Sequence, residues 1–341
     1  MILAPCIGTL FDRFSKKTMS IFIDGSYALL LIATSFLFFQ GKLNDMAFLV
    51  ATILIQAFSQ VHMQSIGFSA VKKHASEHGG RYLALMFALS NGAGIALSGI
   101  TFSLVGFYGC MAIGVLTFIP IIFFYPFLFD GEGPSSREKS SLVDSLRFLW
   151  QDRVLLKFGI VLGLFNVVGA LFPAFLKLEI NRSLTGSDYL TAPILAGGLF
   201  ISVLFYRKID IVTDKLRGGT AFCLSFIPIL LAAASSWFFP HIVTLSLLYL
   251  TACFGSGLRN IVTGNLRNKR VPREKISGVN TLYGAFLSIG PLLGGLFVIP
   301  IVENNMEQGL VTAIAVVCTS VLFSILFLPK ERVGELSREN T

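Results

Sequence analysis

Long apolar stretches alternate with short polar turns along almost the whole chain. A bilayer core of about 30 Å needs ~20 apolar residues in helical form. The stretches lack the two-residue alternation of membrane strands, and a backbone in lipid is satisfied only in helices or closed barrels. The pattern therefore predicts ten membrane-spanning helices, at about 19–40, 46–70, 82–105, 107–129, 158–178, 190–206, 220–239, 241–264, 278–302 and 309–329.

A shorter apolar run precedes these ten. Residues 1–10 reach the charged turn at 11–18 after about half the length that a span needs. We therefore expect an all-α membrane protein with about eleven transmembrane helices, of which the one at 1–10 is cut short.

Lys and Arg are divided unequally between the two sets of turns. One set collects 24 of the 27 basic residues; it comprises the turns 11–18, 71–81, 130–157, 207–219 and 265–277, the tail 330–341 and Arg259 at the end of its helix. The opposite turns hold only Lys42, Lys177 and Arg182. Because cationic loops resist translocation, we expect the first set to be cytoplasmic. The chain then crosses the cell membrane many times and ends in the cytoplasm.

The composition agrees with a chain that lies in lipid, and it argues against other classes of protein. Hydrophobic residues make up 54% of the chain and charged residues 13%, whereas soluble chains carry about 25% charged residues. The five cysteines stand singly in apolar runs, and neither a metal-ligand spacing nor a phosphate-binding Gly-Lys-Ser loop is present. We therefore expect no enzyme, no metal, no cofactor and no nucleic-acid partner, despite the net charge of +8.

A shift of 196 residues superimposes the two halves of the sequence. It places Leu54–Gln60 on Leu250–Ser256 and Gly94–Gly99 on Gly290–Gly295, and it also matches two basic turns. We expect four parts: an incomplete N-terminal helical bundle (1–129), a cytoplasmic central loop (130–157), a C-terminal helical bundle (158–329) and a cytoplasmic tail (330–341). By this repeat the first of twelve helices is missing, through a wrong start, a truncated gene or a genuine variant.

The central loop contains one amphipathic segment. Leu142, Leu146, Phe148 and Leu149 fall near one side of a predicted helix, with the charges elsewhere. Such a helix is expected to lie on the inner face of the membrane and to link the two bundles.

One motif leads to a family. The residues Gly8, Leu10, Asp12, Arg13, Lys16 and Lys17 match the loop between helices 2 and 3 of major facilitator superfamily transporters, written G-x-L-x-D-R-x-G-R-R. The chain resembles this superfamily over essentially its whole length, with Ser15 in place of the usual Gly. The stretch LAPCIGTLFDRFSKK, followed by Asp24, is most similar to the drug-efflux branch that includes macrolide exporters. The resemblance implies a two-bundle helical fold and secondary transport of small molecules.

The motif residues also have a physical interpretation of their own. Gly8 lets two helices approach closely, and Asp12 can accept hydrogen bonds from the amino end of a neighbouring helix. Arg13, Lys16 and Lys17 can bind carboxylates or lipid headgroups. The motif is then a gate that closes the cytoplasmic side; alternatively, the three basic residues only set the topology.

Two charged residues lie inside apolar runs. Asp24 costs ~2.5–3.5 kcal/mol at the centre of a span and less near its edge, so it should face protein and have a partner. We expect either a structural pair with Arg13 or Lys17, or a proton carrier. Arg259 is expected to reach the membrane surface or to pair.

Polar residues inside spans indicate a substrate path. Gln56, Gln60 and Gln64 recur every four residues and share one helix face. The resemblance makes this helix 4, which borders the substrate path in the superfamily, and it adds Asn166 and Phe165 in helix 7. Hydrogen bonding between helices is the alternative function of the glutamine face.

Small residues indicate close helix packing. The candidates are Gly92, Gly94, Gly99, Gly290, Pro291 and Gly294. The resembled antiporters carry a G-P-x-x-G-G motif in helix 5, whereas Gly290 begins that motif in the predicted helix 11, which weakens the case for antiport.

We expect proton-coupled efflux of amphipathic organic compounds by alternating access. Two alternatives stay open: a transport-inactive membrane protein or accessory subunit, and a solute-uptake symporter. The expected partners are membrane lipid, a small-molecule substrate and protons.

Overall fold

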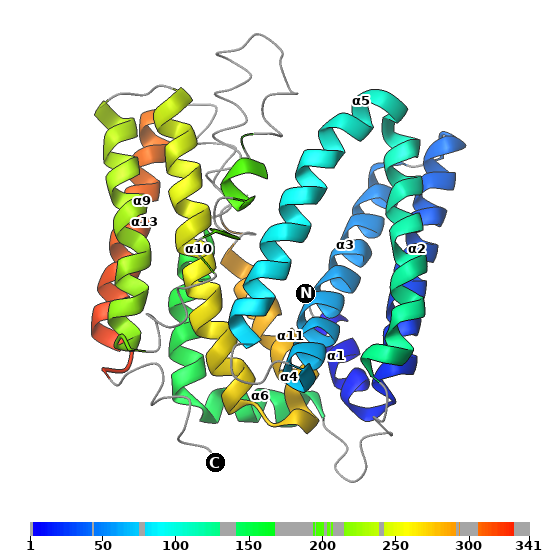
Figure 1. The fold of residues 1–341 in the computed structure, drawn as a ribbon, viewed down its shortest axis with the longest axis horizontal. Helices are drawn as coiled ribbons and strands as arrows, with labels where there is room; N and C mark the ends of the chain where they lie inside the picture. The colour runs from blue at the N-terminus through cyan, green and yellow to red at the C-terminus, as the bar shows by residue number, and fades with distance from the viewer. Residues whose placement is uncertain are drawn as a thin grey trace. The chain divides into compact units, whose positions relative to one another are not determined.

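The computed structural model describes the chain outside a set of gaps. The described residues are 3–42, 44–74, 79–129, 141–167, 194, 196–200, 203–204, 206, 215–238, 242–290, 293 and 306–330. Within these residues the chain is helical and contains no strand (Figure 1). The helices are α1 (Leu3–Arg13), α2 (Lys16–Phe39), α3 (Asp45–Val61), the π-helix η1 (His62–Gly67), α4 (Phe68–His74), α5 (Gly79–Leu128), α6 (Leu142–Gln151), a helix at 153–167, α9 (Gly218–Phe238), α10 (Ile242–Arg270), the short 3₁₀ helix η2 (Arg273–Lys275), α11 (Ile276–Leu287) and α13 (Met306–Phe327).

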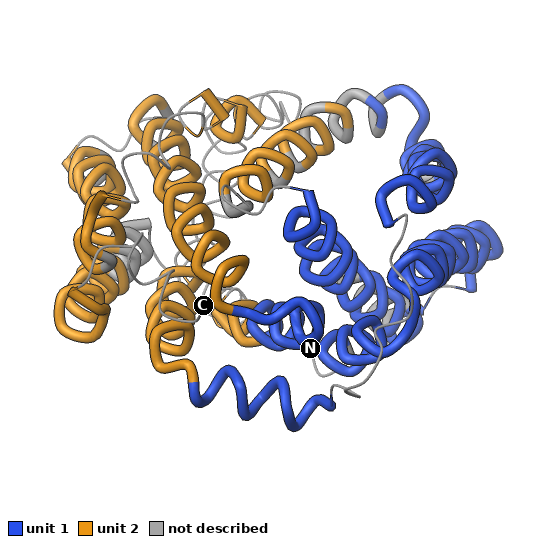
Figure 2. Tube along the Cα trace, turned by 60° about the horizontal axis from the view of Figure 1, so that its bottom comes forward, with its two compact units in different colours: residues 1–74, 100–151, 271–285 blue, residues 75–99, 152–270, 286–341 orange. Residues whose placement is uncertain are grey.

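The chain forms two compact units, coloured separately in Figure 2. Unit 1 comprises Met1–His74, Ile100–Gln151 and Val271–Ala285, and unit 2 comprises Ala75–Gly99, Asp152–Arg270 and Phe286–Thr341. The bundles at 1–129 and 158–329, the central loop at 130–157, the tail at 330–341 and the repeat at 196 residues stay predictions.

Unit 1 is built around helices α1, α2 and α3, with α3 packed against both of the others. Its core includes Phe11, Ile23, Val61 and Tyr125, all at most 2% exposed. Helices α3, η1 and α4 follow one another without a break, so the predicted span at 46–70 is one helical stretch with a wider π turn in its second half.

Unit 2 centres on α9, which packs against α10 and α13 (Figure 1). Phe222 on α9 meets Phe158 edge to face, with ring centroids 5.0 Å apart. Tyr206 and Ile261 form a second cluster with Ala84 and Ala88 of α5. In this second cluster the small side chains of Ala84 and Ala88 leave room for the bulky side chains of Tyr206 and Ile261.

The outer faces of the helices are strongly apolar. Helix α2 exposes Phe22 (62%), Leu29 (67%) and Phe39 (72%), which is the surface expected of a helix in contact with lipid. By length and composition, α2 is the one helix among the described residues that is long and apolar enough to cross a membrane alone; shorter apolar helices occur at Ala112–Leu128, Gly219–Ser235 and Ile314–Phe327.

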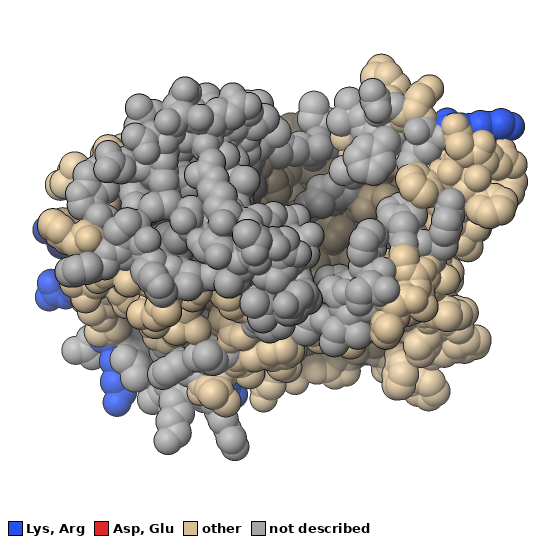
Figure 3. All heavy atoms as spheres, turned by 90° about the horizontal axis from the view of Figure 1, so that it is seen from above, with Lys and Arg blue, Asp and Glu red and all other residues tan. Residues whose placement is uncertain are grey.

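Figure 3 shows where the described charged side chains lie in one view. The described Lys and Arg atoms that are visible lie at the margins of this view, and most of the other described atoms belong to uncharged residues.

Helix α6 buries a different face from the one the apolar pattern suggests. Ser141 caps its start, because the Asp144 N–H donates to Ser141 Oγ at 3.0 Å. Leu149 is buried, as the predicted apolar side requires, but Leu146 is 51% exposed, together with Trp150 at 71%. The exposed apolar residues suit contact with the membrane interface.

A glycine separates the two predicted spans at 82–105 and 107–129. The helical segments on either side join at Gly106, whose φ of 65° and ψ of −167° lie in a region that is essentially restricted to glycine. The chain therefore turns without an intervening loop.

Replacing Gly106 tests this turn. We expect Gly106→Ala to lower the free energy of unfolding by about 1–3 kcal/mol, because alanine is strained at this φ and ψ. Gly94→Ala is the matched control: its Cβ meets nothing within 4 Å, and alanine favours a helix by about 1 kcal/mol. Thermal unfolding in detergent measures both, and equal midpoints for the two variants would contradict the account.

Candidate functional site

A fully buried carboxylate lies inside α2. Asp24 Oδ1 is 2.8 Å from His62 Nδ1, and the hydroxyl of Tyr125 donates to Asp24 Oδ2. Asp24 comes from α2, His62 from the first position of η1, and Tyr125 from the second half of α5. The structure gives Asp24 these two partners instead of the expected Arg13 or Lys17. These two hydrogen bonds within unit 1 therefore offset the free-energy cost of burying the charge of Asp24.

His62 is the more exposed partner of this carboxylate. Its side chain is 32% exposed, whereas that of Asp24 is 1% exposed. Phe118 packs edge to face against His62, with centroids 6.4 Å apart, and against Tyr27 at 4.8 Å. The π segment that His62 begins is of a kind that recurs at functional sites. The role of Asp24 as a proton carrier stays a prediction.

Asp12, the other predicted functional residue, lies in the last turn of α1. Its Oδ1 accepts from the N–H of Ser277 at 3.1 Å, and its Oδ2 accepts from the N–H of Gly278 at 2.6 Å. Both donors lie in the first turn of α11, where free N–H groups and the helix dipole attract an anion. The role of this contact as a gate stays a prediction.

The Asp12 carboxyl is 3% exposed. Burial raises the pKa of Asp12 to about 7, although the hydrogen bonds from Gly278 and Ser277 and the charge of Lys16 lower it. The contact between α1 and α11 therefore contains a group that titrates near neutral pH.

Glycines bring α1, α6 and α11 close together at this contact. A Cβ at Gly8 would overlap with the side chain of Thr281 on α11. A Cβ at Gly278 would lie 2.5 Å from Ser145 Oγ on α6 and 3.0 Å from Thr9 Cγ2 on α1. The close approach predicted for Gly8 is therefore one that the structure contains.

The remaining motif residues lie at the periphery. Leu10 is 42% exposed, Arg13 and Lys17 are exposed, and Lys16 is half-buried. The structure thus brings Gly8 and Asp12 of the motif together against α11.

A lysine missed by the motif also contacts this region. The ammonium of Lys72, on α4, donates to the carbonyl of Val271, five residues before α11. Burial, together with the nearby charge of Arg273, lowers the pKa of Lys72 to about 8. Ser69, one turn earlier, lies 3.2 Å from Ser277 through their hydroxyl oxygens. The charge pattern marked this turn as cytoplasmic but gave Lys72 no partner.

The glutamine face points at protein. A Cβ at Gly284 of α11 would lie 2.8 Å from Gln64 Cγ and 3.2 Å from Gln60 Oε1, so both side chains lie against α11. Gln56 is helical, but its side chain lies outside the described residues. Contact with a substrate stays a prediction for all three.

The two candidates from the helix at 153–167 lie in unit 2. Asn166 Nδ2 donates to the carbonyl of Leu287 at 3.1 Å. Phe165 is 2% exposed, and the Cζ of Arg259 lies 3.3 Å from its ring centroid. Arg259 is itself 0% exposed, so it does not reach the membrane surface as the sequence suggested, and no carboxylate accompanies it among the described residues.

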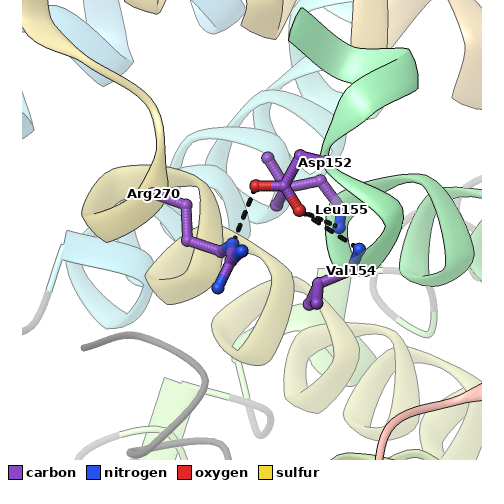
Figure 4. Close-up of polar contacts among 4 residues, drawn as sticks. All are labelled: Asp152, Val154, Leu155 and Arg270. Carbon is purple, nitrogen blue, oxygen red and sulfur yellow. Dashed lines mark hydrogen bonds and ion pairs between the residues drawn. The ribbon is translucent and has the colours of Figure 1, made fainter. Parts of the chain in front are cut away.

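An ion pair joins α10 to the helix at 153–167. Asp152 Oδ2 accepts from Arg270 Nε at 2.8 Å, and both side chains are largely buried. Asp152 Oδ1 accepts from the N–H groups of Val154 and Leu155, each at 3.1 Å (Figure 4). Asp152 is therefore a helix cap and an ionic partner at once. The sequence signal that could have identified this cap is an Asp directly before an apolar helical run.

The predicted packing residues differ in what surrounds them. A Cβ at Gly92 would lie 3.3 Å from Phe200 Cε1, and one at Gly290 would lie 2.8 Å from Asn166 Cβ, so both positions are closely packed. Gly94 has open space around it. The surroundings of Gly99, and both Pro291 and Gly294, lie outside the described residues.

Metal-ligating side chains do not gather in the described part of the chain. No group of three or more His, Cys, Asp or Glu there is arranged to hold a metal ion. The five cysteines are free thiols.

The sequence model of the Major Facilitator Superfamily matches residues 1–295. The chain belongs to this superfamily. It is therefore a multi-pass membrane protein and a secondary transporter of small molecules, not an enzyme. No curated protein matches the sequence.

Solved structures of the superfamily share the fold. A bacterial homologue of the iron transporter ferroportin, in an outward-facing state, is 14% identical with a TM-score of 0.66 over 96% of this chain and 88% of its own. The E. coli fucose:proton symporter is 14% identical with a TM-score of 0.63 over 95% and 87%. The human organic anion transporter MFSD10 is 14% identical with a TM-score of 0.67 over 98% and 80%. The all-α major facilitator fold expected from the sequence is confirmed.

The pKa of Asp12 generates a pH-dependent prediction. Its pKa is raised from 3.8 to about 7 in the contact, so the contact binds a proton more tightly than the separated state does. The contact is therefore favoured at low pH and weakens as the pH rises through 7. Hydrogen exchange of the Ser277 and Gly278 amides, corrected for the intrinsic rate, should be slower at pH 6 than at pH 8.

The control is Asp12→Asn, in which this pH dependence should disappear. Equal corrected protection at both pH values in the unsubstituted protein would contradict the assignment.

Asp152 allows its two interactions to be separated. Asp152→Asn keeps an acceptor for the helix cap but removes the negative charge that pairs with Arg270, which should cost ~3–5 kcal/mol for a buried pair. Asp152→Ala should cost about 1 kcal/mol more through loss of the cap. Unfolding in detergent measures both, and an Asp152→Asn variant as stable as the parent would show that the ion pair contributes nothing.

Proposed function

We propose that the protein exports amphipathic organic compounds and couples export to proton entry at Asp24. The observation that supports this most directly is the cluster of Asp24, His62 and Tyr125. A buried carboxylate in a membrane helix is costly, so such residues usually have a function. Proton relays in transporters are built from Asp and His side chains of this kind.

The chemistry of the cluster suits proton coupling. When Asp24 is ionised, both the Tyr125 hydroxyl and a protonated His62 Nδ1 can donate to it. Hydrogen bonds to a charged group contribute ~1.5–3 kcal/mol each, so neutralising Asp24 weakens the connections from α2 to η1 and α5. Alternating access requires two states a few kcal/mol apart, and this change is of that size.

Asp12 supplies the second element of the proposal. Its hydrogen bonds to Ser277 and Gly278 hold the end of α1 against the start of α11, on the side that the basic turns assign to the cytoplasm. Release of these bonds would let α11 separate from α1. We propose that the cytoplasmic gate opens in this way.

The candidate substrate contacts are considered separately in each unit. In unit 1 the amides of Gln60 and Gln64 suit the polar end of an amphipathic compound, and in unit 2 the ring of Phe165 suits an apolar body. Proton coupling is named for one structural neighbour, the fucose:proton symporter, and the same coupling is proposed here.

A cellular experiment tests the direction of transport. Accumulation of a panel of amphipathic drugs is compared in cells with and without the gene, and a protonophore collapses the gradient in a parallel sample. The proposal predicts lower accumulation in cells with the gene, and loss of this difference with the protonophore. Higher accumulation would indicate an uptake symporter, and unchanged accumulation across the panel would indicate a transport-inactive protein.

Asp24→Asn tests the coupling residue. The amide cannot carry the proton, and loss of a charged hydrogen bond worth ~1.5–3 kcal/mol predicts that proton-driven export falls at least about tenfold. Membrane expression should be unchanged. Glu274→Gln is the matched control, since it neutralises an exposed carboxylate and should leave export as it is. Full proton-driven export by Asp24→Asn would contradict the assignment.

A further inference from the structure

One charged side chain in unit 2 has no charge partner among the described residues. Arg259 lies on α10, eleven residues before the helix ends at Arg270, which is about 16 Å along the axis. It is 0% exposed. The titratable group that lies near it in the described part of unit 2 is Tyr206, whose hydroxyl donates to the Cys253 carbonyl at 3.2 Å.

Neutral groups hold one part of the guanidinium. Arg259 Nη1 donates to Ser225 Oγ at 2.9 Å. Its Cζ lies 3.3 Å from the ring centroid of Phe165 and 4.8 Å from that of Phe226. The faces of these rings attract a cation, so they fix the plane of the guanidinium and surround it with apolar surface.

The other part of the guanidinium is unsatisfied within the described part of the chain. Arg259 Nε and Nη2 are both buried, and neither has a hydrogen-bond partner among the residues that the structure describes. These two nitrogens form one edge of the planar group, the edge that binds a carboxylate through two parallel hydrogen bonds. A buried charge with unsatisfied donors is strongly disfavoured, so this edge is ready to accept an anion.

The backbone around Arg259 is arranged to bring neighbouring helices close. A Cβ at Gly255, one turn earlier, would overlap with the carbonyl oxygen of Ser225 and lie 3.1 Å from Arg259 Nη1. A Cβ at Gly257 would overlap with the phenol of Tyr206. Larger residues at these positions would push α9 and Tyr206 away from the guanidinium.

We propose that the Nε–Nη2 edge of Arg259 binds the carboxylate of an amphipathic organic anion, with Phe165 and Phe226 beside its apolar part. This inference rests on the proposed function and names the substrate class: aromatic or aliphatic carboxylates.

Binding of a matched pair of probes tests the proposal. The full chain in detergent is titrated with 2-naphthoate and, separately, with the uncharged 2-naphthamide, and binding is followed by the thermal unfolding midpoint. We expect 2-naphthoate to raise the midpoint at concentrations at least tenfold below those at which 2-naphthamide acts. Equal effects of the two probes would overturn the proposal.

Three variants assign the effect to this side chain. Arg259→Lys keeps a charge but loses the planar edge, and Arg259→Gln loses both, so each should weaken 2-naphthoate binding at least tenfold. Arg217→Gln, which removes an exposed charge from the same unit, should bind as the parent does. If Arg259→Gln folds and binds 2-naphthoate normally, the proposal is wrong; if it does not fold, the Arg259→Lys result and the probe pair decide.

The outcome is independent of the test of export. Carboxylate binding without any transport would keep this site and refute the proposed function. Proton-driven export of compounds without an acid, together with no preference for 2-naphthoate, would keep the function and refute this site. If a carboxylate of the chain itself bound the guanidinium, the protein would likewise show no preference for 2-naphthoate, and this site would be refuted.

Discussion

Each charge that is buried inside this protein needs a partner, because lipid supplies none. Hydrocarbon cannot solvate a carboxylate or a guanidinium, and an unpaired polar group in it costs several kcal/mol. Asp24 is satisfied by His62 and Tyr125, Asp12 by the first amides of α11, and Asp152 by Arg270 and two backbone amides. These contacts connect helices that lie far apart in the sequence, so the same constraint that limits charge also determines which helices meet.

The two charges deepest in apolar helices are satisfied to different degrees. Asp24 has a hydrogen-bond partner on each carboxylate oxygen, the imidazole of His62 and the hydroxyl of Tyr125. Arg259 has one neutral hydrogen bond and two aromatic neighbours, and one edge of its guanidinium has no hydrogen-bond partner among the described residues. A group with full partners suits coupling, whereas a group with an empty edge suits binding. In our proposals the proton therefore binds in unit 1, and the carboxylate of the substrate binds in unit 2.

The sequence predicted those features that lipid imposes locally. The spans at 19–40, 220–239 and 309–329 were recognisable because a bilayer requires long apolar helices, and α2, α9 and α13 occupy them. The apolar pattern also predicted a break between 82–105 and 107–129, and the structure places Gly106 there. The acceptor role of Asp12 followed from the chemistry of helix ends, since any first turn offers free N–H groups.

Partners across the fold were beyond the same reasoning. His62 and Tyr125 stand 38 and 101 residues from Asp24, and only the packing of α2 against η1 and α5 brings them together. Arg259 seemed close enough to the end of its helix to reach water. Gly255 and Gly257 instead let Ser225 and Tyr206 close over it, and spacing within one helix carries no information about that.

The protonation of Asp24 is the most direct measure of the central claim. Infrared difference spectra of the protein in lipid, recorded between acidic and alkaline pH, report the C=O stretch of a protonated buried carboxyl group. Because buried Asp12 also titrates near pH 7, the comparison is made in an Asp12→Asn background. The account predicts that such a band appears on acidification of Asp12→Asn and is absent when Asp24 is also replaced by Asn. A double variant that shows the same band, or an Asp12→Asn protein that shows none across that range, would contradict proton coupling at Asp24.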